Sequence, residues 1–181
     1  MPSRYTFTEY SPEWPHEFDR EVARLRALLG EEIIRVYHIG STSIPGLAAK
    51  PIIDLMPLVR NIERIDACAP VLEDAGYKAW GECGIPGRRY FTKDRGEYRT
   101  HNVHMFQVDD PQIERHLAFC AYLRSHRRIR AEYAVLKREV YARHPADIDA
   151  YNDGKDHWIK RIERVALEWY RQQSLPGDQV K

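Results

Sequence analysis

Long apolar runs are absent from this sequence of 181 residues. None approaches the ~20 residues that a membrane-spanning helix needs, and the first residues, MPSRYTFTEYSPEW, lack the apolar segment of a signal peptide. An excess of one charge is also absent, because 28 basic residues face 27 acidic ones and the formal net charge is +1. We therefore predict a cytoplasmic protein whose partners are small molecules or proteins, with no nucleic acid and no membrane among them.

Cysteine is scarce as well. The three cysteines, Cys68, Cys83 and Cys120, are far apart and odd in number, which argues against a disulfide framework and against a cysteine metal clip. Hydrophobic residues make up 43% of the chain and charged residues 30%, a composition typical of a globular protein and not of a disordered one. At this length we expect one domain, or one domain with an appendage.

Periodic patterns predict an α+β fold. Apolar residues recur at helical spacing from Trp14 to Leu29, after the start signals Ser11 and Pro12 and before the stop signal Gly30. Strands rich in β-branched and apolar residues are predicted over 33–39, 51–59, 88–93 and 99–108, and DRGEY joins the last two as a hairpin. Further helices are predicted over 61–76, 111–126, 128–143 and about 147–172. The result is a small mixed sheet of about four strands, with an N-terminal helix and a C-terminal helical bundle.

The segment HIGS, His38 to Ser41, ends the first predicted strand. A Gly-Ser turn between a strand and a short helical segment can present backbone N–H groups and hydroxyls to a phosphate. Gly40 permits close approach, Ser41 and Thr42 add donors, and Lys50 supplies a positive charge. The same residues also fit a plain tight turn that Ser41 caps.

Asp54 is the only carboxylate in the apolar strand PIIDLMPLV. A buried, unpaired carboxylate costs several kcal/mol, so a partner for Asp54 is required. One alternative is a structural partner, such as Arg35 on the neighbouring strand or a backbone N–H. The other is a role in binding a metal or a substrate.

Histidines and arginines extend this set. If the strands holding His38 and His104 flank the strand of Asp54, the three side chains converge on one point, and such a set suits Zn²⁺, Mn²⁺ or Fe²⁺ better than Mg²⁺. A hydrogen-bonded core histidine is the alternative. Arg89, in the basic segment RRYFTK, suits phosphate recognition, although a solvated strand face explains the same residues.

The spacing of Gly40-Ser41, twelve residues, and Asp54-Leu55 resembles the signature of the nucleotidyltransferase superfamily related to DNA polymerase β. More closely, HIGSTSIPGLAAKPIIDL, the later NVH and the helical pattern from Arg115 to Ile159 resemble the GrpB family over about residues 5–170. The resemblance implies one GrpB-like domain over 1–181, with a nucleotidyltransferase-like core at about 31–108 and a helical part at about 111–173.

The resemblance also implies a function. It points to binding of a nucleotide or another phosphate-bearing ligand, such as a nucleoside triphosphate, and to nucleotidyl transfer to a small acceptor, with Mg²⁺, Mn²⁺ or Zn²⁺. Family domains fused to dephospho-CoA kinase imply the alternative, an inert or chaperone-like interaction module with a protein partner of CoA biosynthesis.

Eight positions are the candidates for a site, and the resemblance itself supports Gly40, Ser41 and Asp54 among them. Asp54, His104 and His38 are the catalytic candidates, with Asp54 and His104 as metal ligands, and the binding candidates are Gly40, Ser41, Thr42, Lys50 and Arg89. The chain departs from the superfamily pattern in two respects, and one is that the strand RTHNVHMFQV contains no acid to supply a third carboxylate. Active members carry a second carboxylate two residues after the first, on the same face of the strand, and here that position is Met56. The carboxylate set is therefore incomplete.

Overall fold

The computed structural model of the chain describes residues 5–174 and divides into two compact units, Met1–Asp110 and Pro111–Lys181. Each unit is described by itself. The first contains, in order, α1 (Glu13–Leu29), the 3₁₀ turn η1 (Gly30–Glu32), β1 (Ile33–Ile39), the 3₁₀ turn η2 (Ser41–Ser43), β2 (Ile53–Val59), α2 (Ile62–Asp74), β3 (Tyr77–Ala79), β4 (Arg89–Arg95) and β5 (Tyr98–Gln107).

The predicted stop signal of α1 is confirmed, whereas its start is one residue later than predicted, because Pro12 and not Ser11 is the N-cap. The Ser11 hydroxyl accepts a hydrogen bond from the Glu13 N–H, and α1 ends at Gly30, whose φ of 55° is unfavourable for other residues. At the start of α2 the Asn61 side chain accepts hydrogen bonds from the N–H groups of Glu63 and Arg64. These caps satisfy backbone donors that a helix end otherwise leaves without partners.

The strands form one mixed sheet in the order β1-β2-β5-β4-β3. The pair β2 and β5 is parallel, and the other neighbouring pairs are antiparallel. The predicted hairpin between β4 and β5 is confirmed, with Arg95 opposite Tyr98 and Gly96 at a φ of 60° in the tight turn. β3 was not predicted, and it makes the sheet five-stranded instead of four-stranded.

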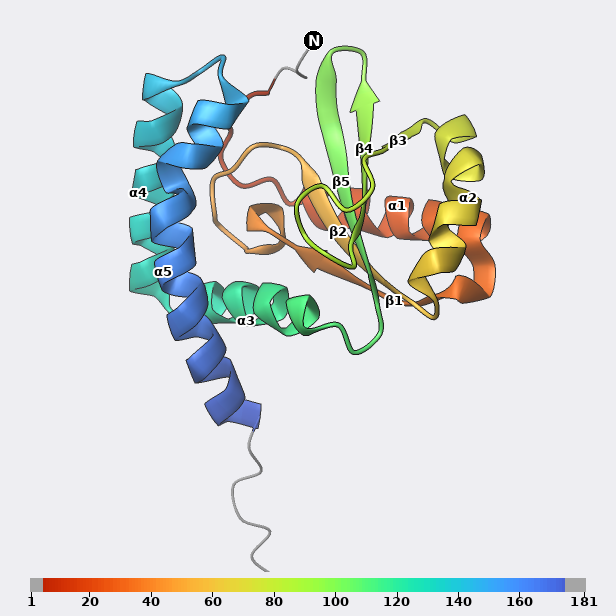
Figure 1. Ribbon diagram of the computed structural model, residues 1–181. Helices are drawn as coiled ribbons and strands as arrows, with labels where there is room; N and C mark the ends of the chain where they lie inside the picture. Colours follow the sequence, from red (N-terminus) through yellow and green to blue (C-terminus); the bar gives the residue numbers. More distant parts are fainter. Residues whose placement is uncertain (1–4, 175–181) are drawn as a thin grey trace, which may run out of the picture. The chain divides into compact units, whose positions relative to one another are not determined.

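Helices α1 and α2 cover one face of the sheet (Figure 1). Leu25 and Leu29 of α1 and Ile65 and Leu72 of α2 are buried there against a set of strand residues, Ile53, Leu55, Val59, Phe91, Val103 and Met105. Because successive strand side chains alternate between faces, the residues between them point to the opposite face. Asp54 is one of these.

One polar network joins α1 to the sheet on this face. Glu21 of α1, only 5% exposed, accepts hydrogen bonds from Lys93 Nζ at 2.7 and 2.8 Å and from the Tyr77 hydroxyl. The His101 Nε2 lies 3.8 Å from a Glu21 oxygen. Burial lowers the pKa of His101 to about 4, although Glu21 opposes this shift. The network ties α1 to β3, β4 and β5.

The second unit consists of α3 (Pro111–Ser125), α4 (Arg127–Arg143) and α5 (Ile148–Ser174), as the periodicity predicts. The rings of Tyr133 on α4 and Trp158 on α5 stack with centroids 4.5 Å apart. Gly154 lets α4 and α5 approach closely, because a Cβ there would lie 2.7 Å from Val140. No helix within residues 5–174 has the length and apolarity needed to cross a membrane.

Candidate functional site

The Gly-Ser turn and the strand carboxylate meet in space. Ile39, the last residue of β1, pairs with Asp54 on β2, so Gly40 begins the turn beside that carboxylate. A Cβ on Gly40 would lie 2.3 Å from the Asp54 Oδ2, and the Gly40 backbone has φ 68° and ψ −172°, a region open almost only to glycine. Glycine is therefore required at position 40 both by its backbone conformation and by the nearness of Asp54.

Asp54 has an amide as its hydrogen-bond partner. Asn102, its register partner on β5, donates from Nδ2 to the Asp54 Oδ1 at 2.8 Å. The Asn102 Oδ1 in turn accepts from the Tyr90 hydroxyl at 2.9 Å and from Arg99 Nη1 at 3.3 Å. These two donors fix the orientation of the amide, so that its N–H group faces the carboxylate.

The charge of Asp54 is stabilised, although the side chain is only 25% exposed. Burial on its own raises the pKa of the Asp54 carboxyl, but nearby His104, the Asn102 hydrogen bond and the charge of Lys50 outweigh it and hold the pKa below its usual value. The folded protein thus keeps an anion at this point of the sheet.

His104 lies two residues after Asn102 and faces the same carboxylate. Its Nε2 is 3.7 Å from the Asp54 Oδ1, and its Nδ1 is 3.2 Å from Arg88 Nη1. A guanidinium only donates hydrogen bonds, so Nδ1 accepts and the neutral ring carries its hydrogen on Nε2. His104 therefore presents an N–H group to the region of Asp54.

Arg88 is held firmly in this position. It is 6% exposed, and it also donates from Nε to the Glu82 carbonyl at 3.1 Å and from Nη2 to the Cys83 carbonyl at 2.6 Å. The loop from Trp80 to Arg88 is thereby tied to the histidine. Cys83 has a φ of 46°, an unusual value for a residue other than glycine.

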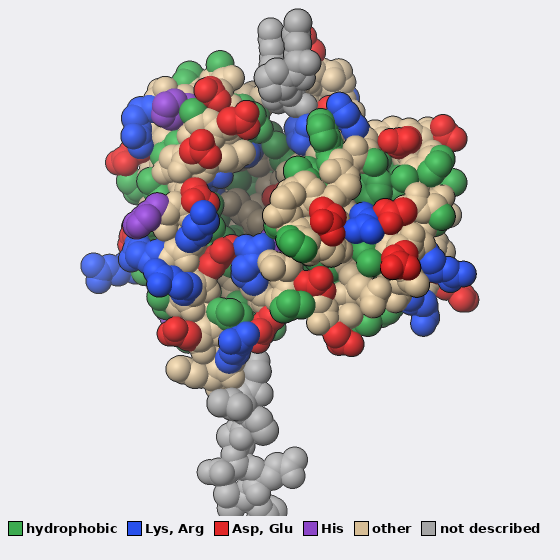
Figure 2. Space-filling view, viewed as in Figure 1, with side chains coloured by type: hydrophobic (Ala, Val, Ile, Leu, Met, Phe, Trp, Pro, Cys, Tyr) green, Lys and Arg blue, Asp and Glu red, His purple; other side chains and the backbone are tan. Residues whose placement is uncertain are grey.

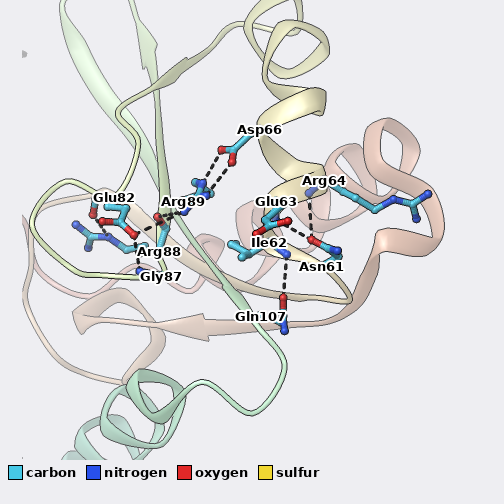
Figure 3. A network of polar contacts seen from close by, with 10 residues as sticks. All are labelled: Asn61, Ile62, Glu63, Arg64, Asp66, Glu82, Gly87, Arg88, Arg89 and Gln107. Carbon is cyan, nitrogen blue, oxygen red and sulfur yellow. Dashed lines mark hydrogen bonds and ion pairs between the residues drawn. The ribbon is translucent and has the colours of Figure 1, made fainter.

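Arg89, the arginine that we predicted for the site, is directed elsewhere. Its guanidinium pairs with both carboxylate oxygens of Asp66 on α2, at 2.5 and 2.8 Å. Figure 3 shows the side chains of Arg88 and Arg89 leaving adjacent positions in different directions, one to the Glu82 loop and the other to α2. The guanidinium that the structure places beside His104 is that of Arg88.

His38 does not converge with Asp54 and His104. It pairs with Leu55, which belongs to the core beneath α1 and α2, and its ring stacks on Phe18 of α1 with centroids 4.7 Å apart. The His38 Nε2 lies 3.0 Å from the Thr42 hydroxyl, which donates to the Ile52 carbonyl. His38 and the buried Thr42 side chain thus join the turn to the strands from the opposite face of the sheet.

Arg35 is not the partner of Asp54. In the register of β1 and β2 it lies opposite Leu58, four residues from the position opposite Asp54, and its guanidinium sits 4.7 Å from the Tyr37 ring centroid. Lys50 lies 5.6 Å from the Tyr5 ring centroid, and its charge also acts on Asp54. Ser41 directly follows Gly40 and begins η2. Binding of an anion by the N–H groups of Ser41 and Thr42 stays a prediction.

The described part of the chain contains no cluster of three His, Cys, Asp or Glu side chains arranged to hold a metal ion. Met56, where a second carboxylate would stand, is fully buried. On β5 the neighbouring face carries Asn102 and His104 and no acid. Asp54 with His104 makes at most two protein ligands, and the adjacent Arg88 guanidinium disfavours a second cation.

Three contributors to this site, Asn102, Tyr90 and Arg88, were not among the site residues predicted from the sequence. The available signal was the alternation of Asn102 and His104 on one strand face. Nothing in the sequence shows that Tyr90 lies opposite His104, because that depends on the register between β4 and β5.

The GrpB protein family model matches residues 4–164 of this chain. The chain belongs to the GrpB family. YqkA of Bacillus subtilis is 51% identical over 88% of the chain, and the chain spans 46% of the length of YqkA. A dephospho-CoA kinase of Mycolicibacterium paratuberculosis is 31% identical over 87% of the chain, and the match spans 45% of that protein.

Solved structures agree with the family and with the fold. The crystal structure of GrpB from Enterococcus faecalis is 46% identical, covers 91% of this chain and 99% of its own, and superposes with a TM-score of 0.87. Cid1 poly(U) polymerase, solved with MgGTP bound, is 17% identical over 76% of this chain and 45% of its own, with a TM-score of 0.51. The latter likeness concerns the fold alone, and it confirms the predicted nucleotidyltransferase-like α+β architecture.

Proposed function

We propose that this GrpB family protein binds a nucleotide or another phosphate-bearing ligand at the Asp54 face of its sheet. The observation that carries the proposal is the contact between Gly40 and Asp54, which brings a Gly-Ser turn against an ionised carboxylate. Backbone N–H groups in such a turn suit phosphate oxygens, and a carboxylate beside them suits the cation that a nucleotide carries.

The surroundings of Asp54 support a phosphate-bearing ligand that carries a bound metal cation. Arg88 and Arg99 each reach a residue that contacts Asp54, and Lys50 adds a third positive charge. Elsewhere the charges are mixed, and acidic and basic side chains are interspersed over most of the face shown in Figure 2. The local excess of cations around one carboxylate is therefore a property of this site and not of the whole surface.

The residues present fit a cation brought by the ligand better than a resident pair of metal ions. Asp54 supplies one carboxylate, and Met56 supplies none. A two-metal nucleotidyl transfer needs ions held by several carboxylates, so we propose binding as the function and derive no transfer step. The His104 Nε2–H would donate to a phosphate oxygen and the Asp54 carboxylate would orient the cation–phosphate group.

A thermal-shift experiment with the four Mg²⁺-nucleoside triphosphates tests the proposal. A ligand at about 100 times its Kd stabilises the native state by about 2.7 kcal/mol, which raises the melting temperature by several degrees. We expect such a shift for the native sequence, its loss in Asp54→Asn, and its retention in Asp74→Asn, an equal charge change at an exposed position of α2. No shift with any triphosphate, or equal shifts in all three proteins, would contradict the proposal.

One comparison favours a second function from a different class. The dephospho-CoA kinase relative contains a match to this chain over 45% of its length, so a GrpB-like segment also occurs in a protein with a further part. The second candidate is an interaction module that stabilises such an enzyme. Complex formation with a separately purified dephospho-CoA kinase, together with no response to nucleotides, would favour the module over the ligand-binding protein.

A further inference from the structure

A cavity in the first unit lies at the beginnings of β2 and β5. It has a volume of about 350 Å³, and its wall includes Tyr5, Ile52, Arg95, Tyr98, Arg99 and Thr100. The N-terminal segment, the start of β2 and the β4–β5 hairpin each contribute to it. A cavity of this size can hold a small organic molecule.

The wall of this cavity is basic and aromatic. Arg95 and Arg99 bring two guanidinium groups, and the Lys50 Nζ lies 5.6 Å from the ring centroid of Tyr5, a wall residue. The Asp94 carboxylate accepts a hydrogen bond from Arg99 Nε at 2.6 Å and so offsets one of these charges. The remaining charge is positive, which favours an anion.

The ring of Tyr98 gives the cavity a second property. It is 45% exposed, a high value for a tyrosine beside a cavity. Planar groups stack on tyrosine rings and on guanidinium planes, and stacking would cover this apolar surface. A ligand that satisfies the charges and also covers Tyr98 has an anionic group and a flat ring.

We propose that this cavity is a binding site for a small planar anion, a ring that bears a phosphate or carboxylate group. Arg95 contacts the anionic group and Tyr98 stacks on the ring. Arg99 connects the cavity to the Asp54 site, because its Nη1 donates to Asn102, which donates to Asp54. The proposal concerns a separate cavity and does not depend on the function proposed above.

Binding to the full chain by isothermal titration calorimetry tests this inference, with AMP as the planar anion, adenosine as the uncharged ring and inorganic phosphate as the anion without a ring. We expect AMP to bind at least about tenfold more tightly than either fragment, which corresponds to about 1.4 kcal/mol. Equal affinity for AMP and phosphate would show that the ring does not contribute to binding and would contradict the proposal. Absence of AMP binding would overturn it.

Variants at Arg95 and Tyr98 separate the contribution of the anionic group to AMP affinity from that of the ring. Arg95→Gln should weaken AMP about tenfold and leave adenosine unchanged, whereas Tyr98→Ala should weaken both. Arg20→Gln, an equal charge change on the exposed face of α1, should have no effect. Melting temperatures of the variants verify that the fold is retained.

Asp54→Asn distinguishes this cavity from the site proposed above. If the cavity binds AMP, Asp54→Asn should change the affinity by less than about threefold, well under the tenfold effect of a lost contact. If AMP binding is lost in Asp54→Asn and unchanged in Arg95→Gln and Tyr98→Ala, AMP occupies the Asp54 site and the inference is wrong. If triphosphates fail to bind while AMP depends on Arg95, the function proposed above fails and the cavity stands.

Discussion

Replacing Gly40 by alanine should destabilise the protein far more than its half-buried position in a turn implies. Two separate costs arise at this residue. Its φ of 68° with ψ of −172° lies in a region that other residues avoid, at about 1–3 kcal/mol. The new Cβ would also stand 2.3 Å from the Asp54 Oδ2, so the carboxylate must move away from Asn102, at about 1.5–3 kcal/mol for a hydrogen bond to a charged group. We expect a total loss of about 2.5–6 kcal/mol, the sum of the two costs.

Gly46 provides the matched control. It lies in the same connecting segment with a φ of 76°, and a Cβ there would meet nothing within 4 Å. Gly46→Ala should therefore cost only the backbone part, about 1–2 kcal/mol. Urea unfolding of both variants, followed by circular dichroism, gives the two values, and an unchanged m-value shows that the comparison is sound.

A double-mutant cycle identifies the cause. In an Asp54→Ala background the clash is largely relieved, and Gly40→Ala should cost about as much as Gly46→Ala. The reasoning would be refuted if Gly40→Ala and Gly46→Ala cost the same stability, within ~0.5 kcal/mol, when Asp54 is present. Differences smaller than this are within the margin to which independent substitutions add. The carboxylate would then play no part in the requirement for glycine.

Two further predictions concern the histidines of β5. The free energy of unfolding should fall by about 2–3 kcal/mol as the pH drops from 6.5 to 4, because His101 takes up its proton near 6.5 when unfolded and only near 4 when buried. Urea titrations across this range should show a smaller fall in His101→Gln, and parallel curves would contradict the burial argument. Arg88→Ala should lower the free energy of unfolding by about 3 kcal/mol, because the Cys83 carbonyl and the His104 Nδ1 lose their donor. Without that donor, His104 should no longer be restricted to the tautomer with hydrogen on Nε2. Nitrogen-15 NMR of the imidazole detects that change, and Arg89→Ala, the control, should leave the tautomer unaltered.

Local signals were sufficient for much of this fold. The start of α1 just after Ser11 and Pro12, its end at Gly30 and the hairpin at Gly96 are each decided by a few neighbouring residues, through hydrogen bonds and positive φ angles. The helices of the second unit follow from apolar spacing in the same way. β3, only three residues long, carries no such signal, and it is a strand because β4 lies beside it.

The nearness of the turn to Asp54 could also be predicted from the sequence. Gly40 follows one strand, and the chain returns through a short connector into the neighbouring antiparallel strand, which brings Gly40 beside Asp54. The other partners were decided by the tertiary structure. Side chains alternate along a strand, so a register difference of one residue exchanges the two faces of the sheet. That choice turned His38 toward Phe18 and set Asn102 beside Asp54. The register is decided by the long-range pairing of β2, β5 and β4. The sequence by itself contains the residues but does not reveal how the strands are aligned.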